Sequence, residues 1–411
     1  MLKWNYHLKY KSFFLLNVVI FVFCLRPPGM TFIIIIVTAL ALLNMLFNGF
    51  FITYDKKLIP LYCFIFYMTM RCIVGFAFNG GYEERYLPVL LLFSCALIIH
   101  SFVAKESELT DIYSSIYYAI VITLVIVGVE MLFGYHLPTS RYSDPDNDAQ
   151  FWSVSKPTAF YYNENDMLSF VVCFLPIAVH QSKYILIKIA MLLVTIISAV
   201  YIGSKAAILA LLVYILFTKV FSRKTIVLII LLGVISILLV APNSIDTILI
   251  VNNSLSRIVG FWDSITTSHY VGDESTSERL LIYKANLNWL LEHPLSLFFG
   301  NGRFADYESE IINIYGLRMG EFHNLHLEMI TIYGLFFWLS FYAFYVFLLY
   351  KIFKLSRSSS GVKPLFLSAL MYPILVSFGP SSSLKYPFLF ILVFFMAIAV
   401  KHNEKKYESD I

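Results

Sequence analysis

The chain has 411 residues, of which 59% are apolar and only 14% are charged, against about 25% charged residues in an average soluble protein. Its mean hydropathy of +0.76 excludes a soluble globular enzyme and a disordered chain. The formal net charge of +4 is too small and too dispersed for nucleic-acid binding. All five cysteines lie inside apolar runs, which excludes a disulfide scaffold. The composition therefore predicts a polytopic membrane protein.

Twelve apolar segments follow one another along the chain, and a helix that crosses the hydrocarbon core takes about 20 residues. They run over residues 12–25, 30–50, 58–78, 86–104, 112–133, 159–180, 184–202, 206–221, 225–241, 325–350, 364–379 and 386–400. The first resembles a signal peptide in length, but Arg26 and two prolines follow it where small residues would mark a cleavage site. We therefore expect an all-α fold with about twelve transmembrane helices, several with little tilt.

The distribution of positive charge predicts the orientation of these spans. With the N-terminus in the cytoplasm, the cytoplasmic segments hold eighteen lysines and arginines, and the short outer loops hold six. The six are Arg26, Arg85, Arg141, Lys156, Lys205 and Lys385. This asymmetry favours both termini in the cytoplasm and an even number of spans.

Two outer segments, 134–158 and 242–324, are too long to be turns. Loops of this length inside a compact fold usually carry function. We therefore expect nine spans within residues 1–241, with the first of these loops among them, and then the large outer loop 242–324. Three further spans follow over 325–400, and a cytoplasmic tail closes the chain at 401–411.

The large outer loop holds five basic and ten acidic residues, so individually placed arginines would have to bind any anion. Hydroxyl residues and an early acid at 275–278 indicate the start of a helix. Leu280, Leu287 and Leu291 then recur at helical spacing, until Pro294 ends the run. Such a helix is amphipathic, so we expect it to lie on the membrane or on the outer face of the bundle.

Two cations are candidate phosphate ligands. Arg279 lies at the start of the amphipathic helix, where a guanidinium and nearby backbone donors could hold a pyrophosphate. A surface arginine paired with Glu274 or Glu278 is the structural alternative. Lys205 follows a Gly-Ser pair between two apolar runs, at the outer surface in this topology. A lysine at the end of a span usually extends to the headgroups, but an outer position runs against the positive-inside bias.

His323 and Asn324 stand together where the large loop re-enters the membrane. A histidine is the usual general base near neutral pH, and Asn324 or Glu328 could orient it or bind a sugar hydroxyl. His326 competes as the relevant imidazole. An interfacial histidine with its polar edge in water is the structural alternative.

Four polar residues in succession begin the sixth apolar segment, and one of them is expected to cap the helix. Alternatively, Asn163 and Asn165 form part of a carbohydrate-binding rim, because amides are natural partners of sugar hydroxyls. The nearby aromatic residues Tyr161, Tyr162 and Trp152 could then stack on sugar rings.

Arg71 is the one basic residue deep in a predicted span. A charge within the membrane is costly and marks a functional candidate, here either a substrate contact or the partner of Glu130 in a buried ion pair.

No metal site is expected, because the sequence has no HExxH motif and no paired cysteines. Asp144, Asp146 and Asp148 alternate in a loop, but no distal Glu completes a calcium-binding pattern.

Four short motifs occur in a fixed order around the large outer loop. They are Asn163-Glu164-Asn165 before a span, Gly203-Ser204-Lys205 at the start of a span, Arg279 ahead of Trp289 and Pro294–Gly302, and His323-Asn324 followed by Leu327 and Gly334. Together they resemble the bacterial O-antigen ligase and polymerase superfamily of membrane glycosyltransferases, over about residues 160–340. The chain departs from the family at one position, where Lys205 replaces the usual arginine and loses its bidentate grip on phosphate.

The resemblance implies a GT-C-like fold in the bacterial inner membrane, with the active site on the outer face. It implies polymerisation of lipid-linked repeat units of an O-antigen, capsule or exopolysaccharide, with no cofactor and no metal. Undecaprenyl-pyrophosphate-linked glycans would be donor and acceptor, and a chain-length regulator and a flippase would be partners. His323 would activate the acceptor hydroxyl, while Arg279 and Lys205 bind the pyrophosphate, with Arg303 as a further contact.

Two alternatives remain open at the level of sequence. An O-antigen ligase uses the same chemistry but transfers the polymer to lipid A-core or another terminal acceptor. A polysaccharide transporter or flippase is expected to show two similar halves and charged residues near the membrane midplane.

Overall fold

The computed structural model describes residues 59–79, 106–143, 156–218, 274–301, 304–315, 322–357 and 359–378, with isolated positions before residue 44 and between 392 and 400. The helices are α3 (Ile59–Asn79), α5 (Glu106–Phe133), α6 (Glu164–Gln181), α7 (Ile185–Ile202), α8 (Lys205–Phe217), α11 (Glu274–Glu292), α12 (Pro294–Phe299), α13 (Phe304–Tyr315), α14 (Leu325–Tyr333), α15 (Leu335–Ser356) and α16 (Lys363–Phe378). No strand occurs in these ranges. The described part of the chain is therefore all-helical, as the sequence predicts.

Three of the described helices are long and apolar enough to cross a membrane. They are the stretch Ile112–Phe133 of α5, the whole of α7 and the whole of α15. Lys205–Phe217 and Lys363–Ser377 are shorter apolar stretches. The full count of twelve spans stays a prediction, because most of the other apolar segments lie partly or wholly outside the described residues.

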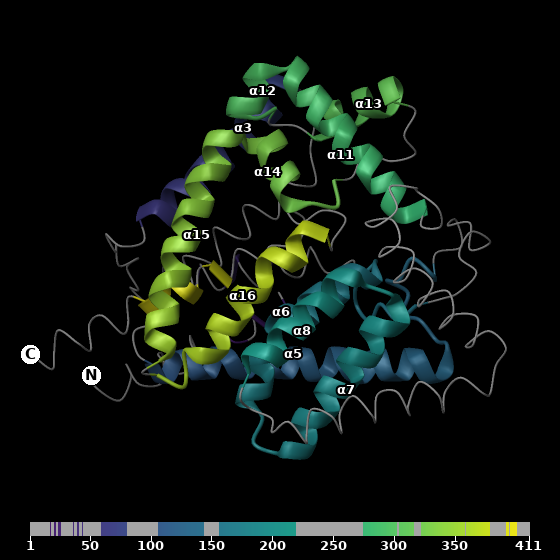
Figure 1. Cartoon of the computed structure of the whole chain (residues 1–411), viewed down its shortest axis with the longest axis vertical. Helices are drawn as coiled ribbons and strands as arrows, with labels where there is room; N and C mark the ends of the chain where they lie inside the picture. The colour runs from purple at the N-terminus through teal and green to yellow at the C-terminus, as the bar shows by residue number, and fades with distance from the viewer. Residues whose placement is uncertain are drawn as a thin grey trace, which may run out of the picture.

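Helix α6 is the centre of the packing. It contacts α5, α7, α8 and α16, and its residues from Asp166 to Val179 are buried throughout. A helix that is apolar on all sides needs such a central position. In Figure 1, α15 runs along the vertical direction, whereas α5 crosses the lower part of the view. The described helices thus do not form a simple parallel bundle.

Helices α11 to α14 form a second group, at the upper end of the molecule in Figure 1, together with α3. Helix α11 contacts α12, α13 and α14, while α12 packs against α14 and α15. The helix expected in the large outer loop is therefore present as α11, and it ends one residue before His293, ahead of Pro294.

The tenth predicted span is not one helix. The sequence predicts a continuous span over 325–350, but the structure divides it at Gly334 into α14 and α15. Gly334 has a positive φ of 94°, which a helix cannot accommodate and which glycine adopts at no steric cost. The prediction of a single span was wrong because a glycine within an apolar run gives no local sign of such a break.

Two glycines allow the ends of α12 and α14 to touch. Gly300 has a φ of 79°, and a Cβ atom there would lie 2.3 Å from the carbonyl oxygen of Ile332. A Cβ atom on Gly334 would lie 2.3 Å from the carbonyl oxygen of Phe298. No side chain fits at either position, so the glycines of two separate sequence motifs specify this contact between backbones.

Candidate functional site

The structure brings the start of α11 and the loop before α14 together around Tyr283. The Tyr283 hydroxyl donates a hydrogen bond to the carbonyl oxygen of His323, at 3.3 Å. It also shares a hydrogen bond with the side chain of Asn324, and Arg279 lies close enough to act on it electrostatically. Arg279 precedes Tyr283 by one helical turn, so both side chains lie along the same edge of α11.

Tyr283 is a neutral hydrogen-bonding group at physiological pH. Burial raises the pKa of its hydroxyl, while the positive charge of Arg279 and the hydrogen bond with Asn324 act in the opposite direction, and the net change is a rise. The sequence interpretation missed this residue. Its spacing of four residues from Arg279 was the one available signal, because the partner loop begins forty residues later.

The backbone at His323 is strained. His323 has a φ of 49°, in the left-handed region, which costs about 1–3 kcal/mol for a residue other than glycine. Such strain persists only where the surroundings enforce it, and it is concentrated at active sites and ligand clamps. Here the flanking Phe322 and Leu325 are fully buried, and Tyr283 holds the carbonyl group of His323.

Asn324 caps helix α14. Its side-chain oxygen accepts hydrogen bonds from the backbone N–H groups of His326, at 2.9 Å, and Leu327, at 3.3 Å. Two of the otherwise unbonded donors at the helix start are thereby satisfied. Glu328 lies on the same first turn and is completely buried, where the positive end of the helix stabilises a carboxylate. Both residues thus fix the helix that follows His323.

His326 has a structural role in this arrangement. The indole N–H of Trp338 donates to its Nδ1 atom at 3.2 Å, and its Nε2 atom lies 2.8 Å from the hydroxyl oxygen of Ser377. Because an indole N–H only donates, Nδ1 must accept, and the proton of the neutral ring lies on Nε2. His326 therefore ties α14 to α15 and α16, with both ring nitrogens already bonded.

Lys205 lies in a different part of the described structure. It is the first residue of α8, after Gly203, whose φ of 73° ends α7. The segment before α6 adjoins this junction, because Lys156 donates a hydrogen bond to the carbonyl oxygen of Ile202 at 2.7 Å. Helix α8 also packs against α16, the helix that contacts His326 through Ser377.

Asn163 is the N-cap of α6. Of the two roles considered for this motif, a helix cap or a carbohydrate-binding rim, the structure shows the helix cap. Its side chain accepts a hydrogen bond from the backbone N–H of Asn165 at 2.8 Å. Glu164 is buried and forms an ion pair of 2.7 Å with Arg141, a residue that the sequence interpretation counted only as a loop charge. Tyr162 is 49% exposed beside this pair.

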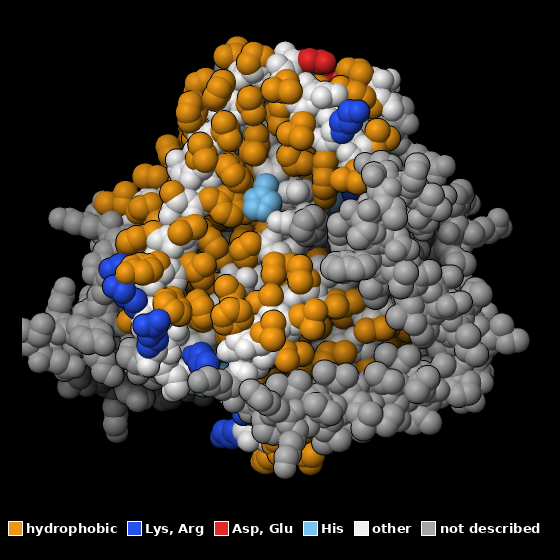
Figure 2. Space-filling model, in the orientation of Figure 1, with side chains coloured by type: hydrophobic (Ala, Val, Ile, Leu, Met, Phe, Trp, Pro, Cys, Tyr) orange, Lys and Arg blue, Asp and Glu red, His pale blue; other side chains and the backbone are white. Residues whose placement is uncertain are grey.

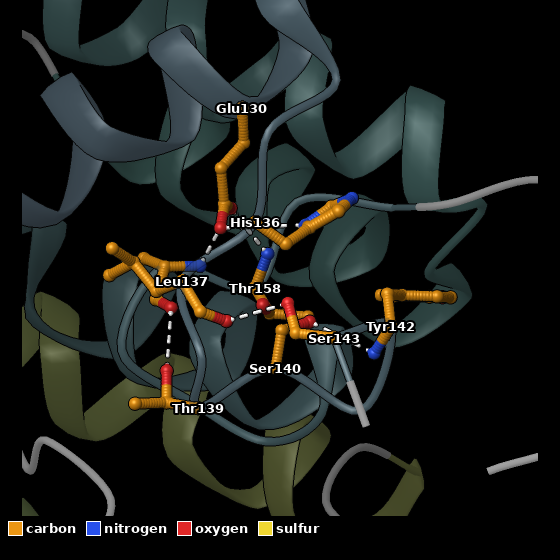
Figure 3. A network of polar contacts seen from close by, with 9 residues as sticks. Glu130, His136, Leu137, Thr139, Ser140, Tyr142, Ser143 and Thr158 are labelled. Carbon is orange, nitrogen blue, oxygen red and sulfur yellow. Dashed lines mark hydrogen bonds and ion pairs between the residues drawn. The ribbon is translucent and has the colours of Figure 1, made fainter. Parts of the chain in front are cut away.

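Glu130 organises the loop between α5 and α6, as Figure 3 shows. Its carboxylate accepts hydrogen bonds from the backbone N–H groups of Thr158, at 2.7 Å, and Ala159, at 2.8 Å. Nδ1 of His136 lies 3.5 Å from the other carboxylate oxygen. The ion pair with Arg71, one of the two alternatives that the sequence left open, is therefore wrong: consecutive backbone amides, which form anion-binding concavities, bind the carboxylate of Glu130.

Arg71 instead contacts the ends of the short helices. Its guanidinium donates to the carbonyl oxygen of Gly300. One turn earlier on α3, the Tyr67 hydroxyl bonds to the carbonyl oxygens of Tyr333, at 3.0 Å, and Phe299, at 3.3 Å. Carbonyl groups at helix C-termini lack intrahelical partners and carry partial negative charge. Helix α3 thus caps α12 and α14 together.

Several predicted features lie outside the described residues. They are Arg303, Trp152 and the three alternating aspartates Asp144, Asp146 and Asp148. Within the described ranges, no group of three or more His, Cys, Asp or Glu side chains is placed to hold a metal ion.

The arrangement offers a cation, a phenolic hydroxyl and an imidazole around one loop. This combination can neutralise an anionic group and accept a proton. A comparison with protein-family models finds no family that matches the chain, and a comparison with curated proteins finds no match.

Proposed function

We propose that this protein is a membrane glycosyltransferase that polymerises oligosaccharide units carried on polyprenyl pyrophosphate. The observation that supports this function is that Arg279 and the backbone of His323 both lie near the Tyr283 hydroxyl. A glycosyl transfer from a diphosphate needs a cation for the leaving group and a proton acceptor for the incoming alcohol, and these two residues supply both.

The proposed reaction is a single displacement. A hydroxyl oxygen of the acceptor sugar attacks the anomeric carbon of the donor glycan, and its proton passes to the imidazole of His323. The bond between the anomeric carbon and the phosphate oxygen breaks, so the lipid diphosphate leaves with the electron pair and the anomeric configuration inverts. Arg279 stabilises the charge that builds on the leaving oxygen in the transition state more than in the ground state.

His323 is a better proton acceptor than its neighbour His326. Protonation of His326 at Nδ1 would replace an acceptor with a donor and oppose the indole N–H of Trp338. The strained backbone at His323 is a further argument, because strain of this kind is maintained where a side chain must be aimed.

The charge distribution supports an outer location for this group. Lysine and arginine side chains gather around the lower end of α15 in Figure 2, whereas α11 to α14 lie at the opposite end. The basic residues at that end of the helix pair α15–α16 are Lys351, Lys354, Arg357 and Lys363. Because basic residues favour the cytoplasmic side, this distribution supports an outer location for Arg279 and His323.

The test is an assay of the purified protein with lipid-linked oligosaccharides extracted from the source cells, read as glycan length on a gel. His323→Ala is expected to lower the rate of bond formation about 10²–10⁴-fold, the usual contribution of a general base. Arg279→Ala is expected to lower it about 10²–10³-fold, as for a lost transition-state donor. Lys183→Ala, at an exposed lysine in the turn between α6 and α7, is the control.

The outcomes separate the candidate functions. A ladder of increasing glycan length identifies a polymerase, and a single transfer to added lipid A-core identifies a ligase. Movement of labelled lipid across the membrane with no new glycosidic bond identifies a flippase. A wild-type ladder from His323→Ala would remove His323 from the mechanism.

A further inference from the structure

Helix α11 carries apolar residues on two opposite faces. Its inner face holds Ile282 and Trp289, both 2% exposed. The outward face carries Leu287, Leu291 and, continuing into α12, Leu295, which are 51%, 73% and 76% exposed. Leu287 and Leu291 lie one turn apart on α11, and Leu295 follows them on α12 after the helix break at His293. We call these three exposed leucines the leucine stripe. Adjacent leucines this exposed are typical of a surface that contacts lipid or another protein.

The leucine stripe continues onto a candidate membrane-spanning helix. Phe298 of α12 stacks on Phe336 of α15, with ring centroids 5.4 Å apart, and Phe336 itself is 55% exposed. One turn further along α15, Leu339 is half exposed. Figure 2 shows hydrophobic side chains spread over α15, α12 and α11 on this face. The leucine stripe and the exposed apolar face of α15 therefore form one continuous surface.

We propose that α11 and α12 dock onto the outer leaflet of the bilayer, with the leucine stripe among the lipid acyl chains. The outward face of α15 is long and apolar enough to span a membrane, so acyl chains cover it, and the stripe extends that surface. Lys284 is also exposed on this side of α11, one turn before Leu287. A lysine stem can lie along acyl chains while its ammonium group reaches the phosphates, which suits a helix at interfacial depth.

Docking of α11 sets the depth of the proposed active site. Arg279 and Tyr283 lie along one flank of α11, between its buried face and the leucine stripe. A helix held in the leaflet by its leucines would keep these two side chains at the level of the headgroups. This last step rests on the proposed function, because a lipid-linked pyrophosphate has its diphosphate at that level.

Spin-label accessibility in the full-length protein tests the docking directly. Leu287→Cys, Leu291→Cys and Leu295→Cys are each spin-labelled in nanodiscs of phosphatidylethanolamine and phosphatidylglycerol. Collisions with oxygen, which partitions into acyl chains, are compared with collisions with a water-soluble nickel chelate. Exposed Cys63 is replaced by serine in all samples, and the signal of the unsubstituted protein is subtracted. Glu292→Cys, exposed next to Leu291, is the matched control.

Oxygen collisions are expected to exceed nickel collisions at all three leucine positions, with the reverse at Glu292. Nickel collisions that prevail at the leucines would show that the stripe faces water and would overturn the proposal. Exclusion of both reagents would show that protein covers the stripe, such as a second copy of this chain, and would overturn it equally. No glycan enters this experiment, so its failure leaves the proposed reaction standing, and an inactive His323→Ala variant leaves the docking standing.

Discussion

At the scale of single residues, Tyr283 links the two halves of the proposed site. Its hydroxyl contacts the backbone of His323 and the side chain of Asn324, and its helix carries Arg279 one turn away. None of these contacts follows from the sequence pattern, because they join a helix surface to a loop forty residues later. The sequence thus suggested the residues proposed to react, whereas the contact with Tyr283 comes from the structure alone.

The Tyr283→Phe variant tests this alignment. It removes the hydroxyl and keeps the ring, so the fold should persist. Two hydrogen bonds of about 1 kcal/mol each are lost, and part of this loss should appear as a rate of bond formation about tenfold lower. Tyr184→Phe, at a tyrosine that is 69% exposed, is the control. Equal rates for the two variants would show that Tyr283 aligns nothing.

Backbone strain at His323 can be separated from its chemistry by two substitutions. His323→Gly and His323→Ala both remove the imidazole, so both should form glycosidic bonds at the same rate, about 10²–10⁴-fold below that of the unsubstituted protein. Glycine adopts a φ of 49° without a steric cost, so the glycine variant should be more stable than the alanine variant by about 1 kcal/mol or more. Thermal unfolding in detergent measures this difference. Equal unfolding temperatures would mean that the loop relaxes once the imidazole is gone.

At the scale of elements, the crossing of α12 and α14 determines where His323 lies. Helix α14 has nine residues and is therefore about 14 Å long. Its C-terminal end is fixed against Gly300 and capped by Tyr67, and its N-terminal end follows His323. A displacement at the glycine contact would therefore be carried along a rigid rod to the imidazole.

Gly334→Ala should destabilise the protein and displace α14. The added Cβ atom would lie 2.3 Å from the carbonyl oxygen of Phe298. This oxygen belongs to the backbone, so it can move away only if helix α12 shifts. Gly128→Ala in α5 is the matched control, since nothing lies within 4 Å of a Cβ atom there, and it should stabilise the helix by up to about 1 kcal/mol. Opposite shifts of the unfolding temperature are expected. Shifts of the same sign would contradict the contact.

At the scale of the whole molecule, long apolar segments were the most predictable feature. Helices α5, α7 and α15 correspond to such segments, because burial in lipid or in a core requires runs of this length. Helix α11 was predicted from its hydroxyl start, its leucine spacing and Pro294. Each of these signals is local, so each can be read from a short stretch of sequence.

Features that depend on backbone groups could not be predicted. An ion pair between Arg71 and Glu130 was one of two alternatives, because Glu130 was the only plausible buried counter-ion for Arg71. Each instead bonds to the main chain, Arg71 to a carbonyl group and Glu130 to two amides. Peptide groups are the same at every position of a sequence, so side-chain patterns carry no information about which of them become partners. The break at Gly334 was missed for a related reason, since φ is a property of the backbone.

The capping of two helices by α3 has a consequence for how the chain can be divided. A fragment that begins after Asn79 would keep Arg279, Tyr283 and His323, and yet it would lack the donors that satisfy the carbonyl groups of Phe299, Gly300 and Tyr333. Such a fragment would hold the reacting groups on helices whose ends are no longer joined. Helix α3 thus supports the helices that carry the proposed site, so a chimaera that exchanges one without the other is expected to lose this junction.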